Sequence, residues 1–113
     1  MNDVIKLLQS HRSIRKFTDQ EIPRGLLLEL IKAGQAAATS SHVQAYSVIH
    51  VKDAANREQL AELSGGQGYV ASSAVFLVFC ADMKRPTEAS ARTGANVERG
   101  MTEQLLVATV DTA

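Results

Sequence analysis

Residues 74–81 (AVFLVFCA) restrict the fold of this chain more than any other segment, because every one of them is apolar. A strand with one solvent-facing side alternates apolar and polar residues, whereas a strand covered on both faces does not. The run is also far shorter than the roughly 20 residues that a membrane-spanning helix needs. We therefore expect a central strand of a sheet, with other elements packed over both of its faces.

The first half of the chain carries signals for two helices and a second strand. Asn2 can cap a short first helix. Pro23 suits the start of a second helix over about residues 23–37, which has an apolar stripe formed by Leu27, Leu30, Ile31 and Gly34. Residues 47–51 (SVIHV) are short and rich in β-branched side chains, which is typical of a strand.

A third helix is expected between the two strands. Asp53 can cap its beginning, and Leu60 and Leu63 supply its apolar face. Gly65 and Gly66 offer the left-handed conformation in which helices commonly end. The helix should therefore end just before this glycine pair.

A last helix is expected after a polar stretch over about residues 82–96. It places four side chains along one side, namely Met101, Leu105, Ala108 and Thr112. No glycine, basic last turn or proline marks its end, as expected for a chain cut within a helix. The order helix, helix, strand, helix, strand, helix indicates an α+β or α/β class with helices packed on a small central sheet.

Length and charge narrow the possible functions. A chain of 113 residues can form one domain with one core, so we expect a single domain over residues 1–113. Twelve basic and twelve acidic side chains leave no net field for nucleic acid or an anionic membrane, so small molecules or protein surfaces are the expected partners. The N-terminus lacks the apolar stretch of a signal peptide, and a lone cysteine, Cys80, cannot form an internal disulfide. Both features favour a soluble cytoplasmic protein.

Residues 11–15 (HRSIR) form the first candidate site. If this segment is extended, His11, Ser13 and Arg15 fall on one side and Arg12 flanks them. Two guanidinium groups and a hydroxyl make a good phosphate receptor, because arginine offers paired planar donors and keeps its charge. On spacing alone, the commoner interpretation is that such residues complement the dipole of the preceding helix and stay solvated.

Two other polar groups are candidates for holding a ligand. The first consists of Thr39, Ser40 and Ser41, followed by Gln44, and the second of Gln67 and Tyr69. Their hydroxyl and amide groups can pair with a phosphate or with the polar edge of a heterocycle. Either group is also what an ordinary loop or helix-ending turn contains.

The chain offers little chemistry of its own. Cys80 lies in the apolar run without a nearby cation, which is typical of an inert core cysteine. The histidines His11, His42 and His50 lack the spacing of a metal site, so no metal is expected. No nucleophile elbow, catalytic triad or pair of carboxylates stands out. If the protein is an enzyme, a cofactor should perform the difficult chemistry.

A more specific pattern extends over four segments: residues 11–18 (HRSIRKFT), 37–44 (AATSSHVQ), 65–70 (GGQGYV) and 76–82 (FLVFCAD). In order and separation these segments resemble the N-terminal half of the nitroreductase family, in its NADPH-dependent flavin-reductase branch. The resemblance extends over essentially the whole chain, whereas members of that family are considerably longer. It implies an α+β nitroreductase fold, with residues 1–113 as the N-terminal half of one domain.

The resemblance also implies a cofactor and its site. Members of the family are homodimers with FMN at the subunit interface, where both chains contribute. Carried over by motif, the phosphate and ribityl side of FMN would be held by His11, Arg12, Ser13 and Arg15. The next loop would contribute Thr39, Ser40 and Ser41, and the isoalloxazine ring would lie beside Gln67 and Tyr69.

The implied activity is ping-pong transfer of electrons from NADPH, through FMN, to nitroaromatics, quinones or free flavin. In the family, the glycine-rich segment beside the flavin, further basic phosphate ligands and the NADPH-contacting arginines lie in the second half. Three hypotheses follow for this chain. The first is that it forms the flavin-phosphate half of an oxidoreductase. The second is a noncatalytic binding or dimerisation module, and the third is a small anion-binding or nucleotide-binding domain.

Overall fold

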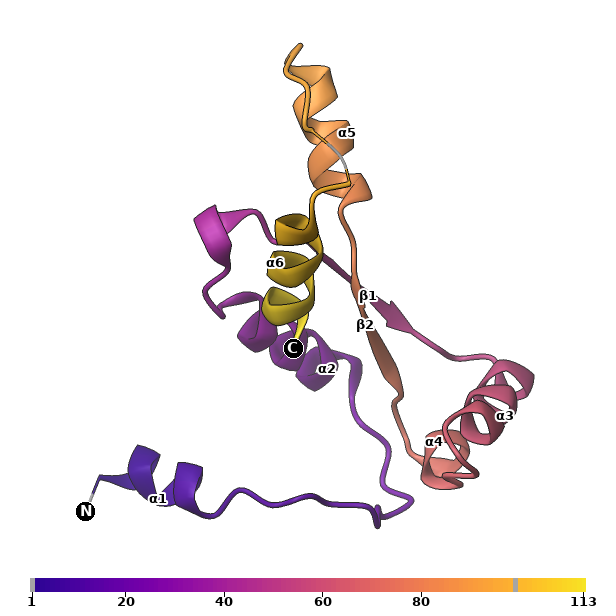
Figure 1. Ribbon diagram of the computed structural model, residues 1–113. Helices are drawn as coiled ribbons and strands as arrows, with labels where there is room; N and C mark the ends of the chain where they lie inside the picture. The colour runs from indigo at the N-terminus through magenta and orange to yellow at the C-terminus, as the bar shows by residue number, and fades with distance from the viewer. Residues whose placement is uncertain (1, 99) are drawn as a thin grey trace.

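The computed structural model describes residues 2–98 and 100–113 of the chain (Figure 1). The elements follow in the order α1 (Asp3–Gln9), α2 (Arg24–Gln35), η1 (Ser40–His42, a single 3₁₀ turn), β1 (Tyr46–His50), α3 (Ala54–Leu63), α4 (Tyr69–Ser72), β2 (Leu77–Ala81), α5 (Lys84–Arg92) and α6 (Thr102–Thr112). The family of folds expected from the sequence, helices with a small sheet, is confirmed. No described helix has both the length and the apolarity that a bilayer crossing requires.

The two strands meet in an antiparallel ladder that runs from Tyr46 opposite Ala81 to His50 opposite Leu77. Backbone hydrogen bonds continue the pairing beyond both ends. Val51 N–H donates to the Phe76 carbonyl at 3.1 Å, and Asp82 N–H donates to that of Ala45 at 2.8 Å. Helix α6 contacts both strands, so three segments that are distant in sequence are joined here (Figure 1).

The expectation of a central strand covered on both faces is wrong for residues 74–81. Only residues 77–81 are a strand, and β1 is the one strand that pairs with it in the described part of the chain. Phe79 of β2 is 50% exposed. The apolar pattern encodes burial on both faces, but the described residues provide one neighbouring strand and α6, which together leave part of β2 uncovered.

The helix signals are confirmed at several ends. The Asn2 side chain accepts a hydrogen bond from Val4 N–H at 2.9 Å, and that of Asp53 accepts one from Asn56 N–H at 2.8 Å. Gly65 and Gly66 have φ of 84° and 76°, and Gly66 N–H donates to the Ala61 carbonyl at 2.9 Å. This is the left-handed helix ending that a residue without Cβ adopts most easily.

Other expected helix faces are only partly correct. Leu63 of α3 is 84% exposed, and the side chain buried in its place is that of Ala61. On α6 Ala108 is buried at 2% exposure, whereas Leu105 lies largely in solvent. Helices α4 and α5 were not expected, because α4 is a single turn and α5 lies within the polar stretch after β2.

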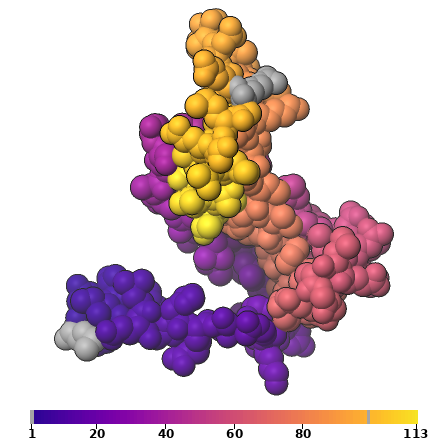
Figure 2. Space-filling view, viewed as in Figure 1, coloured from indigo at the N-terminus to yellow at the C-terminus, as the bar shows by residue number. Residues whose placement is uncertain are grey.

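The chain spreads over far more surface than a compact protein of its size. Its accessible surface is 9155 Å² and its radius of gyration is 17.3 Å. A compact monomer of 12.2 kDa would have about 6,100 Å² and about 13 Å. Figure 2 shows the cause, since the N-terminal arm with α1 projects from the body, as does α5 at the opposite end. The excess is about 3,000 Å² on this one chain, whereas an obligate interface of about 2,000–5,000 Å² takes only about 1,000–2,500 Å² from each partner.

The carboxylate of Asp82 joins the end of β2 to β1. Ser47 Oγ–H donates to it, and Lys84 N–H donates to its other oxygen at 2.9 Å. The pKa of Asp82 lies below its ordinary value of 3.8, mainly because of the Ser47 hydrogen bond and next because of the Lys84 amide, while partial desolvation opposes them. The backbone and charge of Arg85 lower the pKa slightly further.

We predict that Ser47→Ala flattens the acid limb of the stability curve. A carboxyl group whose pKa is lower in the folded state stabilises the fold above its unfolded pKa of about 4, and this stabilisation is lost as pH falls through the folded pKa. Urea denaturation between pH 7 and pH 2 measures the free energy of unfolding. The matched control is Ser64→Ala, since the Ser64 hydroxyl donates only to a backbone carbonyl. A loss of stability in Ser47→Ala that is the same at every pH would contradict the assignment.

Arg57 ties α3 to α4. Its Nε donates to the Val70 carbonyl at 3.0 Å, and its Nη2 donates to the Ser73 carbonyl and, at 2.9 Å, to Ser73 Oγ.

We predict that Arg57→Ala speeds amide hydrogen exchange in residues 69–72 by roughly ten- to a hundredfold, because hydrogen bonds from a charged donor are lost. Arg57→Lys should restore little, since an ammonium group lacks the fork. Arg92→Ala on α5 is the control, and equal protection in all three variants would refute the tie.

Candidate functional site

The basic segment, residues 11–15, lies in the stretch of chain between α1 and α2, which we call the arm (Figure 1). The side chains of His11, Arg12, Ser13 and Arg15 are all exposed. Arg12 Nε donates to the Ser10 carbonyl at 3.1 Å, and neither arginine pairs with a carboxylate within residues 2–98 and 100–113. The segment forms neither helix nor strand, and its guanidinium charges are not neutralised by the described residues.

The hydroxyl-rich loop, residues 39–44, follows α2 and contains several residues with positive φ. Ser41, His42 and Gln44 have φ between 51° and 55°, the left-handed region that residues with a Cβ rarely adopt. Two side chains hold the loop from either side. Thr39 Oγ1 accepts a hydrogen bond from Gln44 N–H at 3.2 Å, and the Asp111 carboxylate on α6 accepts one from Ser40 N–H at 2.9 Å.

The third candidate group, Gln67 and Tyr69, lies between the end of α3 and the first residue of α4. The Tyr69 hydroxyl donates to Gln67 Oε1, so these two predicted residues are in direct contact. The Tyr69 ring also meets the edge of Phe17, with centroids 6.1 Å apart and planes at 63°. Because Phe17 lies two residues beyond Arg15, this contact holds the arm beside Gln67.

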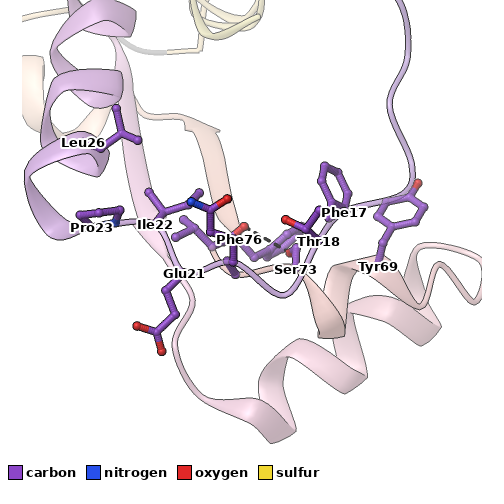
Figure 3. A pocket seen from close by; sticks show the side chains of 12 residues that line it. Phe17, Thr18, Glu21, Ile22, Pro23, Leu26, Tyr69, Ser73 and Phe76 are labelled. Carbon is purple, nitrogen blue, oxygen red and sulfur yellow. Dashed lines mark hydrogen bonds between the residues drawn. The ribbon is translucent and has the colours of Figure 1, made fainter.

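A hollow of about 440 Å³ opens beside that aromatic contact. Figure 3 shows Phe17 and Tyr69 at one end and Ile22, Pro23 and Leu26 at the other. Its walls also include Thr18, Gln20, Glu21, Ser73, Ala74, Val75 and Phe76. The lining is mainly apolar with a few polar groups, a composition that is common in small-molecule sites.

The three predicted groups are only partly brought together. The arm and the Gln67–Tyr69 pair meet through Phe17. The hydroxyl-rich loop lies elsewhere, against α6, and Figure 1 separates it clearly from the arm. Within the described residues, no three His, Cys, Asp or Glu side chains gather as metal ligands do.

Residue-by-residue reasoning missed Phe17 and Asp111, which connect the predicted groups to the rest of the fold. Phe17 was available as the aromatic residue directly after two basic side chains. Asp111 had no such signal, because its partner Ser40 is 71 positions away along the chain.

Comparisons with known proteins assign the chain to a family. A sequence model described as the nitroreductase family matches residues 8–108. The FMN reductase (NADPH) of Bacillus subtilis is 41% identical over 115 aligned residues, covering 100% of this chain and 46% of the relative. The oxygen-insensitive NADPH nitroreductase of Salmonella typhimurium is 42% identical, covering 100% of this chain and 45% of the relative.

Solved structures have the same shape over the same portion. NfrA1 of B. megaterium aligns with a TM-score of 0.91 at 39% identity, covering 98% of this chain and 46% of the other. The NADPH:FMN oxidoreductase of Vibrio harveyi, complexed with NAD⁺, aligns with a TM-score of 0.87 at 40% identity, covering 98% and 46%. The chain thus spans less than half the length of these relatives. With the matched residues, the identities and the shared fold, this chain belongs to the nitroreductase family.

Proposed function

We propose that residues 1–113 form the N-terminal, flavin-phosphate half of a single nitroreductase-like domain that transfers electrons from NADPH to nitroaromatics, quinones or free flavin. One observation carries the proposal most directly. The arm carries Arg12 and Arg15 without a described carboxylate partner, and Phe17 fastens it against Tyr69, beside Gln67. This supports a phosphate held by Arg12 and Arg15, with the edge of the ring beside the point where Phe17 of the same arm meets Tyr69.

The donor set fits FMN. A phosphate suits the guanidinium forks of Arg12 and Arg15, with the hydroxyl of Ser13 and the imidazole of His11 beside them. The amide of Gln67 and the phenol of Tyr69 suit a ring edge that both donates and accepts hydrogen bonds. Hydroxyl groups for the rest of the cofactor would come from the loop residues Thr39, Ser40 and Ser41, of which Ser40 Oγ also lies 3.5 Å from Asp111 Oδ1.

When bound, FMN would supply the two-electron chemistry between NADPH and the acceptor. The described residues would then bind the phosphate, orient the ring and shield one of its faces. NADPH as the reductant is supported by the names of the relatives, which include an FMN reductase (NADPH) and an NADPH-flavin oxidoreductase.

We further propose that the working form is a cytoplasmic homodimer whose subunits include the second half of the fold. The excess surface of about 3,000 Å² on this chain supports the proposal, since an obligate interface takes about 1,000–2,500 Å² from each partner and the second half of the fold would cover the remainder. The separation of the hydroxyl-rich loop from the arm supports a pocket that is completed by another polypeptide segment.

A noncatalytic module is the alternative, and the same separation favours it for the 113-residue chain by itself. A phosphate held by the arm alone would lack burial of the ring, and binding energy is lost when a pocket is open. Such a chain would assemble with partners but show no flavin turnover.

The deciding experiment compares two proteins. One is this chain, and the other is a chimera in which the second half of the B. subtilis FMN reductase (NADPH) follows Ala113. We expect the chimera to shift the absorbance spectrum of FMN on titration and to oxidise NADPH in the presence of a quinone. We expect the chain alone to bind FMN at least about tenfold more weakly. A chimera that folds, by circular dichroism, yet neither binds FMN nor turns over would overturn the proposed function.

We predict separately that Arg15→Ala and Ser13→Ala each weaken FMN binding by the chimera. Loss of a charge-assisted hydrogen bond to phosphate should cost Arg15→Ala roughly ten- to a hundredfold in affinity, and loss of the neutral hydroxyl should cost Ser13→Ala less. Quenching of flavin fluorescence measures both. Lys16→Ala is the matched control, because it removes an equal charge from the next position. If all three variants bind FMN equally well, the phosphate assignment fails.

A further inference from the structure

The loop that follows α2 is held in a conformation that it would not adopt unaided. Left-handed backbone is unfavourable for a residue with a Cβ, and Ser41, His42 and Gln44 all adopt it within four positions. Such strain persists only where surrounding contacts hold it, and it concentrates at ligand clamps and switch regions. Something in the fold must therefore fix this loop.

Two contacts within the loop contribute to holding it. His42 N–H donates to the Thr39 carbonyl at 3.1 Å, and Thr39 Oγ1 accepts from Gln44 N–H at 3.2 Å. Both belong to the segment itself, so they shape the turn without attaching it to the body of the protein.

Asp111 provides the attachment. Its Oδ2 accepts the hydrogen bond from Ser40 N–H at 2.9 Å, and its Oδ1 lies 3.5 Å from Ser40 Oγ. An amide bound to a carboxylate is a charge-assisted hydrogen bond, roughly twice as strong as a neutral one. The contact joins the strained loop to α6, which itself packs on β1 and β2.

The position of Asp111 on its helix adds a second argument. It lies in the last turn of α6, where the helix dipole disfavours a negative charge, and that turn contains no basic residue. The Ser40 amide and hydroxyl supply the positive ends of two dipoles at that point. The carboxylate is thus compensated by the loop and not by its own helix.

We propose that Asp111 is a positioning residue that holds the hydroxyl-rich loop in its strained, flavin-binding form. This inference rests on the proposed function. It also gives the polar groups of the loop different roles, because the amide of Ser40 is already hydrogen-bonded to Asp111. Ser41 Oγ and the Thr39 hydroxyl proton have no acceptor among the described residues, which leaves them free to meet a ligand.

The test replaces Asp111 in this chain and in the chimera. Asp111→Ala removes both acceptors, whereas Asp111→Asn keeps an acceptor for the Ser40 amide and removes the charge. Glu103→Gln, at the first turn of the same helix, is the matched control for loss of a carboxylate. Two readouts are needed. One is the hydrogen-exchange rate of the Ser40 amide without flavin, and the other is FMN affinity from fluorescence quenching.

We expect Asp111→Ala to raise the Ser40 exchange rate and to weaken FMN binding by about tenfold, with Asp111→Asn recovering most of both losses. Glu103→Gln should resemble the unaltered protein. The sign of the affinity change is informative, because a carboxylate that merely repelled the anionic cofactor would give tighter FMN binding when removed.

Tighter or unchanged FMN binding in Asp111→Ala would overturn the positioning role. Unchanged exchange at Ser40 would overturn the attachment itself. If the unaltered chimera fails to bind FMN, the proposed function fails and the flavin role of Asp111 fails with it. The Ser40 exchange rate in the flavin-free chain then still decides whether Asp111 holds the loop.

Discussion

The antiparallel ladder between β1 and β2 is the constraint on which the rest of the structure depends. It joins residues 46–50 to residues 77–81, and α6 rests on the pair. Two of the three candidate ligand groups connect directly to this ladder or to the chain between its strands, whereas the arm reaches it only through the contact of Phe17 with Tyr69. The hydroxyl-rich loop enters β1 and is tied to α6, while Gln67 and Tyr69 belong to the segment between the strands. If the ladder slipped by one residue, each inward side chain would move to the opposite face.

The small core explains why such a ladder needs further cover. The buried apolar side chains of the described residues are those of Ala45, Ala61, Val70 and Ala108, three of which are alanine. Burial contributes about 25 cal/mol for each Å² of apolar surface, so small side chains contribute little. Large apolar side chains such as Leu7, Phe79 and Leu105 remain exposed instead. The same portion has this shape within solved chains about twice as long.

Sequence reasoning succeeded where local chemistry decides the outcome. Asn2, Asp53 and the Gly65–Gly66 pair act within a few positions of their partners, so their roles could be predicted from neighbours alone. It failed where the answer depends on what lies across the fold. Whether Leu63 is buried depends on a facing surface, and the pairing of Ser40 with Asp111 depends on α6 returning beside the loop. The motif resemblance predicted a set of site residues, and the fold shows which of these predicted residues meet.

Basic and acidic side chains are equal in number but unevenly distributed along the chain, and this distribution bears on the choice of ligand. Residues 4–18 contain Lys6, Arg12, Arg15 and Lys16 and no acidic side chain, although the whole chain has equal numbers of both signs. The described ion pairs, Lys6 with Asp3 and Lys84 with Glu88, are exposed and contribute little. The arm therefore has a local positive field that salt screens beyond about 8–10 Å.

A field of that range attracts any small phosphate, so it cannot by itself select a flavin. In the proposed flavin site, selection would have to come from contacts with the ring, which makes the placement of Phe17 against Tyr69 as important to the proposal as the arginines.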